Sequence, residues 1–399
     1  MQKITLGVIF GGKSPEHDVS VISAVECMNQ INRDKYTVIP IYIDRNNTWF
    51  TGEALRSLYT FDPFDANKEG IYPCAPDING SGKLITYPIT KRKHLQCFGG
   101  KPKMDTLDCV CIVMHGAYGE DGSLQGLLEM ANIPYTSTGV PGSAIGMDKI
   151  MMKQFFRGAE LPILDSVWLT RKEFEKDRDA ACNKVEKALD YPVFVKPANL
   201  GSSIGVTKAK DTNALIEALT LAFMLDRRVM VEAGVEKPIE VNCAVIGYDD
   251  ECEASEVELI QTDGNILTIE RKYGEKTVKP YEHVIPAPID ESLRDRIQSL
   301  SADIFRMMDC KGVIRIDYMI DPENQALYIT EVNTIPGSLA HYLWVNLGKP
   351  YHTLIDMMVK DALKAHNDKK RNTFIHANAI ISNTLWGIHK GGKGKINRK

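Results

Sequence analysis

The sequence predicts an α/β protein of several domains, and three observations support this prediction. A chain of 399 residues is too long for one hydrophobic core, so two or three domains are expected. Residues 4–10, 19–31 and 37–44 follow a strand, helix, strand order, which is typical of a parallel sheet covered by helices. Residues 312–320 and 327–337 alternate apolar and polar side chains around turn residues 321–324, which predicts an antiparallel hairpin of the α+β kind.

The composition excludes several function classes. Hydrophobic residues make up 44% and charged residues 25% of the chain, as in ordinary globular proteins. A formal charge of −4 gives no general attraction to nucleic acid or anionic membranes. No apolar run reaches the roughly 18 residues of a spanning helix, and the N-terminus lacks a signal-peptide cleavage pattern. The nine cysteines are odd in number and scattered, which favours reduced thiols in the cytoplasm.

The first domain is expected to span residues 1–146 and to carry polar residues at the ends of its strands. Glu16 follows a Gly-Gly turn, where it either stabilises the next helix or holds a substrate ammonium group, and local sequence leaves both open. His115 follows a buried strand within a Gly-rich loop, which makes it a candidate substrate contact, although a lone histidine is more often structural. Residues 51–104 have weak apolar periodicity and are interpreted as an insertion rather than core.

The second domain, expected at residues 147–233, contains a candidate phosphate site. Lys149 opens a new helix, and Lys196 is the one charged residue in an apolar strand. A Gly-Ser-rich loop with Ser202 and Ser203 follows at once, so its N–H groups and the lysine can together hold phosphate oxygens. The loop lacks the ending of a Walker A motif. A flexible hairpin turn is the alternative, but it gives Lys196 no role.

The third domain, expected at residues 234–366, carries a candidate metal site on the hairpin. Arg315 and Asp317 share one face of the first strand, while Glu331 and Asn333 share one face of the second. Two carboxylates and an amide oxygen are suitable ligands for Mg²⁺ when water and phosphate fill the other positions. A charged face turned to solvent is the alternative for any one of these residues.

Two acidic residues are candidate nucleotide contacts, and two polar segments are expected to lie outside the sheets. Glu232 and Glu240 are candidates to accept hydrogen bonds from an adenine amine and ribose hydroxyls, although exposed acidic residues are common. The long polar segment at residues 256–288 is interpreted as a lid. Residues 367–399 form a basic, Gly-rich tail that is expected to be disordered and without catalytic duty.

Taken in order, these motifs resemble the D-alanine:D-alanine ligase family of ATP-grasp enzymes. The resemblance covers about residues 3 to 365, and it is the ordered set that is specific. The matching segments are Pro15-Glu16-His17-Asp18-Val19-Ser20, residues 115–122, Met147-Asp148-Lys149, Val195-Lys196-Pro197, Gly201-Ser202-Ser203-Ile204-Gly205, Lys272-Tyr273, Arg315-Ile316-Asp317 and residues 331–337. The resemblance implies a three-domain ATP-grasp fold, with ATP gripped between the sheets of the second and third domains.

The resemblance also implies a mechanism and a role for each residue. The carboxylate of a first D-amino acid attacks the γ-phosphate of ATP, and the amine of a second then displaces phosphate from the acyl phosphate. Phosphoryl transfer needs charge neutralisation above all, so cations should gather at the site. The implied nucleotide and metal contacts are Lys149 and Lys196 on the α- and β-phosphates, Lys272 on the γ-phosphate, and Asp317, Glu331 and Asn333 on two Mg²⁺ or Mn²⁺ ions.

Further roles implied by the resemblance concern the amino acid substrates. Glu16 takes the first ammonium group and His115 lies near its carboxylate. Arg315 and the Gly337 N–H stabilise the oxyanion of the tetrahedral intermediate. Ser202, Tyr273 and Glu16 form a hydrogen-bonded trio that joins loop, lid and first domain. A homodimer through the first domain is also implied.

The acceptor is the point at which the chain departs from the family pattern. Tyr273 in the lid favours an amine acceptor over D-lactate. Residues 338–344 carry Tyr342 where the family has a small hydroxyl residue that helps hold the second substrate's carboxylate, with Leu343 beside it. D-alanine is the expected acceptor, and a D-alanine:D-serine ligase of the vancomycin-resistance type is the alternative, although the segment lacks the arginine of some resistance ligases.

The sequence opposes two functions of other classes. A nucleotide-binding regulator without catalysis would have lost a metal ligand or the lid lysine, but Asp317, Glu331, Asn333 and Lys272 are all present. An ATP-grasp carboxylase or peptide-tagging ligase would need a different first domain, which the motifs around Glu16 and His115 oppose.

Overall fold

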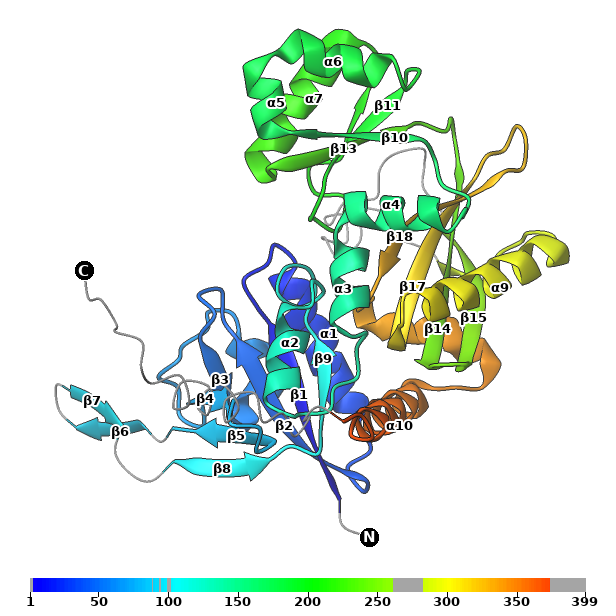
Figure 1. The fold of residues 1–399 in the computed structure, drawn as a ribbon. Helices are drawn as coiled ribbons and strands as arrows, with labels where there is room; N and C mark the ends of the chain where they lie inside the picture. The colour runs from blue at the N-terminus through cyan, green and yellow to red at the C-terminus, as the bar shows by residue number, and fades with distance from the viewer. Residues whose placement is uncertain (1–2, 88, 93–94, 99–101, 261–282, 374–399) are drawn as a thin grey trace, which may run out of the picture.

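The structure is a computed structural model that describes residues 3–373, apart from 88, 93–94, 99–101 and 261–282. The described residues form three larger sheets, each in its own stretch of chain, and a small two-stranded ribbon. Figure 1 shows the first sheet at the bottom, the second at the top and the third beside the gap between them. The α/β prediction, with a parallel N-terminal part and antiparallel later parts, is confirmed.

The first sheet has the strand order β8-β5-β4-β3-β2-β1-β9. Strand β1 (Ile4–Gly11) pairs in parallel with both β2 (Tyr36–Ile43) and β9 (Cys109–Val113), and these apolar strands form its buried centre. Helices α1 (His17–Gln30) and α2 (Ser123–Met130) follow the turns at the ends of β1 and β9. The carboxyl ends of β1 and β9 thus lead into the loops that carry Glu16 and His115, as expected for parallel strands.

Residues 51–104 extend the first sheet instead of forming a separate insertion outside the core. Strands β3 (Trp49–Thr51), β4 (Tyr72–Pro76), β5 (Lys83–Thr86) and β8 (Lys103–Thr106) continue it antiparallel, while β6 (Ile89–Arg92) and β7 (Leu95–Phe98) pair with each other. Leu55, Ile71 and Leu84 are buried in the first core. The weak periodicity arises because these strands are short and separated by turns, so few side chains of each face the core.

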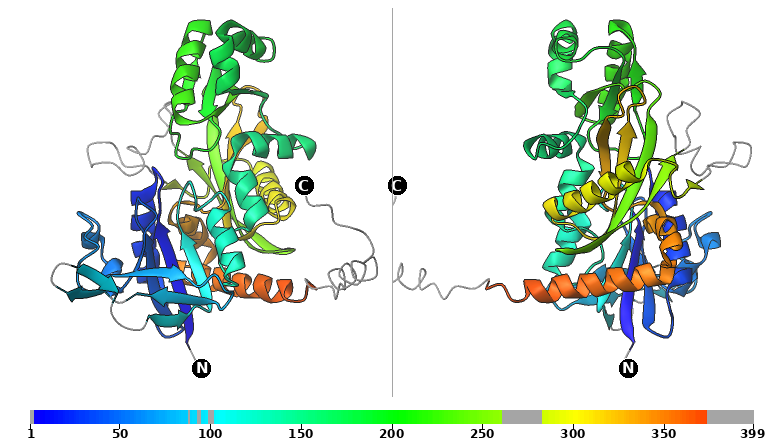
Figure 2. Two further views of the ribbon diagram at one scale, coloured as in Figure 1. Left: turned by 60° about the vertical axis from the view of Figure 1, so that its left-hand side comes forward. Right: turned by 90° about the vertical axis from the view of Figure 1, so that its right-hand side faces the viewer.

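The second sheet is antiparallel and has the order β10-β13-β11-β12. Its strands are β10 (Ser166–Thr170), β11 (Val193–Pro197), β12 (Thr207–Ala209) and β13 (Arg228–Ala233). Helices α5 (Arg171–Lys176), α6 (Arg178–Glu186) and α7 (Thr212–Leu225) pack on it, as Figure 2 shows from two sides. Lys196 lies near the end of β11, directly before the loop at residues 198–206.

The third sheet is also antiparallel and has the order β16-β15-β14-β17-β18. Its strands are β14 (Ile239–Tyr248), β15 (Glu251–Ile260), β16 (His283–Val284), β17 (Lys311–Ile320) and β18 (Leu327–Asn333). Helix α9 (Glu291–Met307) covers one face, and Met152 and Phe156 of α4 (Lys149–Gly158) join the same core. The predicted hairpin is confirmed as β17 and β18.

The C-terminal helices return to the first core. The helical segment η3 (Gly337–Leu347) and helix α10 (Tyr351–Lys369) place Trp344, Leu354 and Met358 among the buried residues of the first sheet. Helix α3 (Val140–Met147) links the first sheet to α4. The predicted domain limits at 146, 233 and 366 stay predictions. Each of the three larger sheets lies within one predicted domain, but α4 packs on the third sheet and α10 packs on the first core. No helix of the described residues has the length and apolar character to cross a membrane.

Candidate active site

A cavity of about 1210 Å³ lies between the three sheets. It is lined by residues of the second and third sheets and by residues of the segments that follow β1 and β9 of the first. The structure brings most of the sequence-predicted site residues to this cavity: Glu16, His115, Lys149, Lys196, Ser202, Ser203, Glu232, Glu240, Arg315, Asp317, Glu331, Asn333, Gly337 and Tyr342. Leu343 does not line the cavity, because its side chain is buried in the first core. Lys272 and Tyr273 lie outside the described residues.

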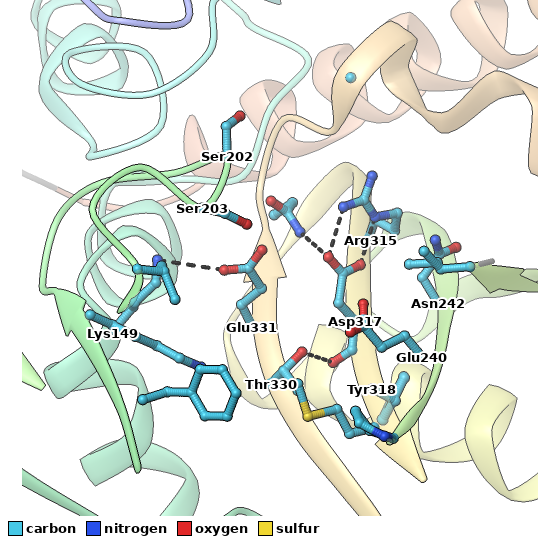
Figure 3. A pocket seen from close by; sticks show the side chains of 18 of the residues that line it. Lys149, Ser202, Ser203, Glu240, Asn242, Arg315, Asp317, Tyr318, Thr330 and Glu331 are labelled. Carbon is cyan, nitrogen blue, oxygen red and sulfur yellow. Dashed lines mark hydrogen bonds and ion pairs between the residues drawn. The ribbon is translucent and has the colours of Figure 1, made fainter. Parts of the chain in front are cut away.

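The hairpin places its four polar residues as the strand register requires. Arg315 pairs with Asn333 and Asp317 with Glu331 across β17 and β18, so all four side chains meet on one face. The Arg315 Nε and Nη2 atoms each donate to one oxygen of Asp317, both at 2.7 Å. Burial alone would lower the pKa of Arg315, but the Asp317 charge raises it well above its ordinary value. Figure 3 shows this pair facing Glu331.

The oxygens of this face suit a hard divalent cation. Asp317, Glu331 and Asn333 offer carboxylate and amide oxygens, as Mg²⁺ prefers. Both oxygens of Asp317 accept from Arg315, and Asn333 Nδ2 also donates to Oδ2 at 3.1 Å, so a cation would share or displace these bonds. The described residues contain no group of three or more His, Cys, Asp or Glu side chains around one point. Two carboxylates and one amide oxygen fill only part of the octahedral shell of Mg²⁺, so phosphate oxygens and water would take the other positions.

Lys149 approaches the hairpin from the other side of the cavity. The side chain of Asp148 caps α4 by accepting from the Ile150 and Met151 N–H groups, which fixes the direction of Lys149. Lys149 Nζ donates to the Leu200 carbonyl at 2.8 Å and lies 3.5 Å from Glu331 Oε2. Lys149 thus joins the loop after β11 to the hairpin, and Figure 3 shows its ion pair with Glu331.

The loop after β11 has an unusual backbone. Ser202 and Ser203 adopt left-handed φ values of 51° and 58°, which cost non-glycine residues energy and tend to occur at functional sites. Ser202 Oγ donates to Glu16 Oε1 in a short hydrogen bond that joins the second and first sheets. A Cβ atom at Gly201 would come within 2.8 Å of Glu16 Oε2, so the absence of a side chain lets the loop approach the carboxylate.

Glu120 belongs to the site but was not among the predicted site residues. Its Oε2 accepts from the Gly116 N–H at 2.8 Å and its Oε1 from the Ile335 N–H at 2.9 Å. Burial, together with the nearby Glu16 charge, raises the pKa of Glu120 to about 8. The sequence showed this glutamate in a Gly-rich loop, but its burial depends on residues more than 200 positions away.

The raised pKa of Glu120 predicts a pH-dependent stability. Because its ordinary pKa is 4.5, the folded state binds this proton more tightly between pH 4.5 and about 8. The stabilisation is complete below pH 4.5 and is lost as the pH rises to about 8. In Glu120→Gln, the fall in unfolding free energy between pH 5 and pH 8 should shrink by on the order of 1 kcal/mol. Urea unfolding at both pH values measures the unfolding free energy, and the exposed Glu175→Gln serves as the control. An equal fall in unfolding free energy in the parent and in Glu120→Gln would contradict the prediction.

His115 is held from two sides by the protein. Its Nδ1 lies 2.9 Å from the Ile335 carbonyl oxygen and its Nε2 lies 3.3 Å from Ser23 Oγ. Burial lowers the pKa of His115. The His115 ring connects the first sheet to the segment before Gly337 and so positions that segment. The contact of His115 with a substrate carboxylate stays a prediction.

Glu232 and Glu240 both line the cavity, on the side of the second sheet and of β14. Glu232 is 1% exposed and lies within 2.6 Å of Lys153 Nζ and 2.5 Å of Lys196 Nζ. Its Oε1 lies beside Lys153 Nζ and its Oε2 beside Lys196 Nζ, so each oxygen of this buried carboxylate faces a lysine. The predicted contacts of Glu232 with an adenine amine and of Glu240 with ribose stay predictions.

Comparison with known proteins places this geometry in a family. The family model described as D-ala D-ala ligase N-terminus matches residues 5–138, and the model described as D-ala D-ala ligase C-terminus matches residues 155–360. The chain belongs to the D-Ala D-Ala ligase family. A D-alanine–D-alanine ligase of Thermosipho africanus is 37% identical over 371 residues, which cover 93% of this chain and 96% of the relative.

Solved structures of the D-Ala D-Ala ligase family share the fold. The VanG D-Ala:D-Ser ligase from Enterococcus faecalis aligns with a TM-score of 0.76 and 29% identity, covering 90% of this chain and 100% of that one. The D-alanine–D-alanine ligase from Coxiella burnetii aligns with a TM-score of 0.75 and 25% identity, covering 98% and 100%. The predicted family and the ATP-grasp fold class are thereby confirmed.

Tyr342 is the predicted point of departure from the family pattern. Its ring packs against His283 with centroids 4.4 Å apart, and burial raises its pKa. Residues 338–340, just before it, adopt left-handed φ values of 46° to 52°, a run that non-glycine residues rarely form. His283 comes from β16, so this contact lies beyond the reach of local sequence patterns.

Proposed function

We propose that this chain joins two molecules of D-alanine in an ATP-dependent reaction that supplies the dipeptide for peptidoglycan precursors. The observation that carries the proposal is the convergence of three groups of residues on one cavity: Glu16 with Ser202, the lysines Lys149 and Lys196, and the hairpin face of Arg315, Asp317, Glu331 and Asn333. Membership of the D-Ala D-Ala ligase family supports the same reaction.

The residues divide the work of the reaction between them. Glu16 holds the ammonium group of the first D-alanine, so that its carboxylate faces the phosphates. Lys149 and Lys196 bind the α- and β-phosphates of ATP, Ser203 adds a contact from the loop, and Glu232 and Glu240 hold adenine and ribose. Lys272 and Tyr273 act from outside the described residues, on the γ-phosphate and on the Ser202–Glu16 pair.

Charge neutralisation is the main contribution to the rate. The D-alanine carboxylate attacks the γ-phosphorus, ADP leaves, and the amine of the second D-alanine then displaces phosphate from the acyl phosphate. Arg315 and the Gly337 N–H stabilise the oxyanion formed at the carbonyl, a contribution worth about 10²–10³ in rate per donor in comparable sites. Asp317, Glu331 and Asn333 would hold two Mg²⁺ or Mn²⁺ ions, which supply positive charge to the phosphate oxygens.

The acceptor amino acid distinguishes two candidate functions. A D-alanine:D-serine ligase is the second candidate, favoured by the Tyr342 and His283 wall and by the likeness to VanG. The test is ADP release with D-alanine alone, and with D-alanine plus D-serine or D-lactate, each product identified by mass. Efficient formation of the D-alanine dimer supports the proposal, while turnover that requires D-serine makes the second candidate the function.

Three further assignments accompany the proposal. The three sheets are the cores of three domains, and two chains associate through the first domain. The reaction takes place in the cytoplasm, where ATP is available and the eight cysteines described as free thiols stay reduced. Sedimentation of the purified chain tests the dimer.

A further inference from the structure

Lys153 is a buried lysine for which the reaction outlined above has no role. Its side chain is 1% exposed, and among the largest fully buried side chains it is the one that carries a formal charge. It lies on α4 four residues after Lys149, so both lysines project from the same face of the helix. Lys149 lines the cavity, whereas Lys153 does not.

The ammonium group of Lys153 completes a buried group of three charges. Its Nζ lies 2.6 Å from Glu232 Oε1 and donates to the Ile329 carbonyl at 2.9 Å. Lys196 Nζ lies 2.5 Å from the other oxygen, Glu232 Oε2. One carboxylate on β13 is therefore shared by a lysine from α4 and a lysine from β11.

The charges of the group support one another. Burial lowers the pKa of Lys153, although the Glu232 charge opposes this shift. The pKa of Glu232 is lowered despite its burial, because both lysines favour its charged form. The pKa of Lys196 is raised despite burial by the same carboxylate. Each oxygen of Glu232 therefore has a lysine nitrogen beside it, Lys153 on one side and Lys196 on the other.

The two lysines differ in what else they can reach. Lys196 lines the cavity, while Lys153 is closed off behind Glu232. With Lys196 as the sole partner, a phosphate and Glu232 would compete for one ammonium group. Withdrawal of that group would leave a buried carboxylate unpaired, which is strongly unfavourable.

We propose that Lys153 is a positioning residue that neutralises Glu232 and so releases Lys196 to bind the phosphates of the nucleotide. The inference rests on the proposed function in one respect, namely that Lys196 binds nucleotide phosphates. It assigns to Lys153 a role in nucleotide affinity that does not require contact with the nucleotide. This role of Lys153 requires the Glu232 carboxylate, whereas a general effect of Lys153 on folding would not.

The test is a double-mutant cycle read by direct binding of ADP, with calorimetry on the full chain. Lys153→Met should weaken ADP binding by at least about 30-fold, since binding then leaves Glu232 unpaired. In the Glu232→Gln background the same substitution should weaken binding by less than about threefold, because no buried carboxylate remains to be neutralised. Lys153→Arg should retain most of the affinity, since it keeps the charge.

Controls separate the role from a structural one. Lys184→Met removes an exposed lysine that pairs with Glu173 at 3.3 Å, and it should leave ADP binding unchanged. If Lys153→Met weakens ADP binding equally in both backgrounds, Lys153 only holds α4 in place and the inference is overturned. The inference is also overturned if Lys153→Met does not weaken ADP binding when Glu232 is present. If Lys153→Met does not fold, Lys153→Gln replaces it in the cycle. Failure of the parent chain to bind ADP would contradict the proposed function instead.

Discussion

Replacing Asp317 by asparagine is expected to lower the rate of D-alanine-dependent ADP release by about 10³-fold or more. Two physical effects add together. The substitution removes one of the charged oxygens that would hold Mg²⁺, and it takes away the carboxylate that accepts both hydrogen bonds of Arg315 at 2.7 Å. Arg315 then has no fixed direction at the carbonyl that reacts. Steady-state kinetics over a series of Mg²⁺ concentrations measure the effect.

Asp321→Asn is the matched control, because Asp321 lies in the turn of the same hairpin and its carboxylate accepts from the Glu323 N–H. That variant should keep the rate within about twofold. A rate for Asp317→Asn within threefold of the parent would remove the hairpin face from the mechanism.

Replacing Glu16 by glutamine should raise the KM for D-alanine by about 10- to 100-fold and leave the KM for ATP nearly unchanged. The carboxylate accepts from Ser202 Oγ and is approached closely by Gly116 and Gly201, so it faces the junction of three loops. Glutamine has almost the same shape but no negative charge, and it binds an ammonium group weakly. Initial rates measured with each substrate varied in turn separate the two KM values.

Asp18→Asn provides the comparison for Glu16. Asp18 lies one half-turn further along the same helix, is exposed, and pairs with Arg45 at 2.7 Å outside the cavity. It should change neither KM. Equal increases of both KM values in Glu16→Gln would mean that Glu16 only stabilises the start of α1.

The sequence was sufficient for the hairpin because its evidence is local. Because side chains alternate along a strand, the sequence of β17 and β18 alone places four polar residues on one face: Arg315, Asp317, Glu331 and Asn333. The observed register of the two strands confirms this placement. The same holds for Lys196 and its loop, where an apolar strand carries one charge before glycine and serine residues. Ordered motifs then allowed the family to be recognised.

Other features depend on contacts between distant segments and were not predictable. The pKa of Glu120 follows from burial under residues around Ile335, and the role proposed for Lys153 follows from Glu232, 79 positions away. Tyr342 stood out in the sequence, but its packing against His283 did not. Residues 51–104 lacked a clear period because their strands are short and separated by turns, so their part in the first sheet was not predicted.

The central claim is that this cavity activates the carboxylate of D-alanine by transferring phosphate to it from ATP. The most direct measurement uses D-alanine with ¹⁸O in both carboxylate positions, together with ATP and Mg²⁺, and determines the masses of phosphate and dipeptide. The expected products are ADP, phosphate carrying one ¹⁸O atom, and a dipeptide whose new amide retains one ¹⁸O from the first D-alanine. Unlabelled phosphate, or AMP in place of ADP, would contradict it.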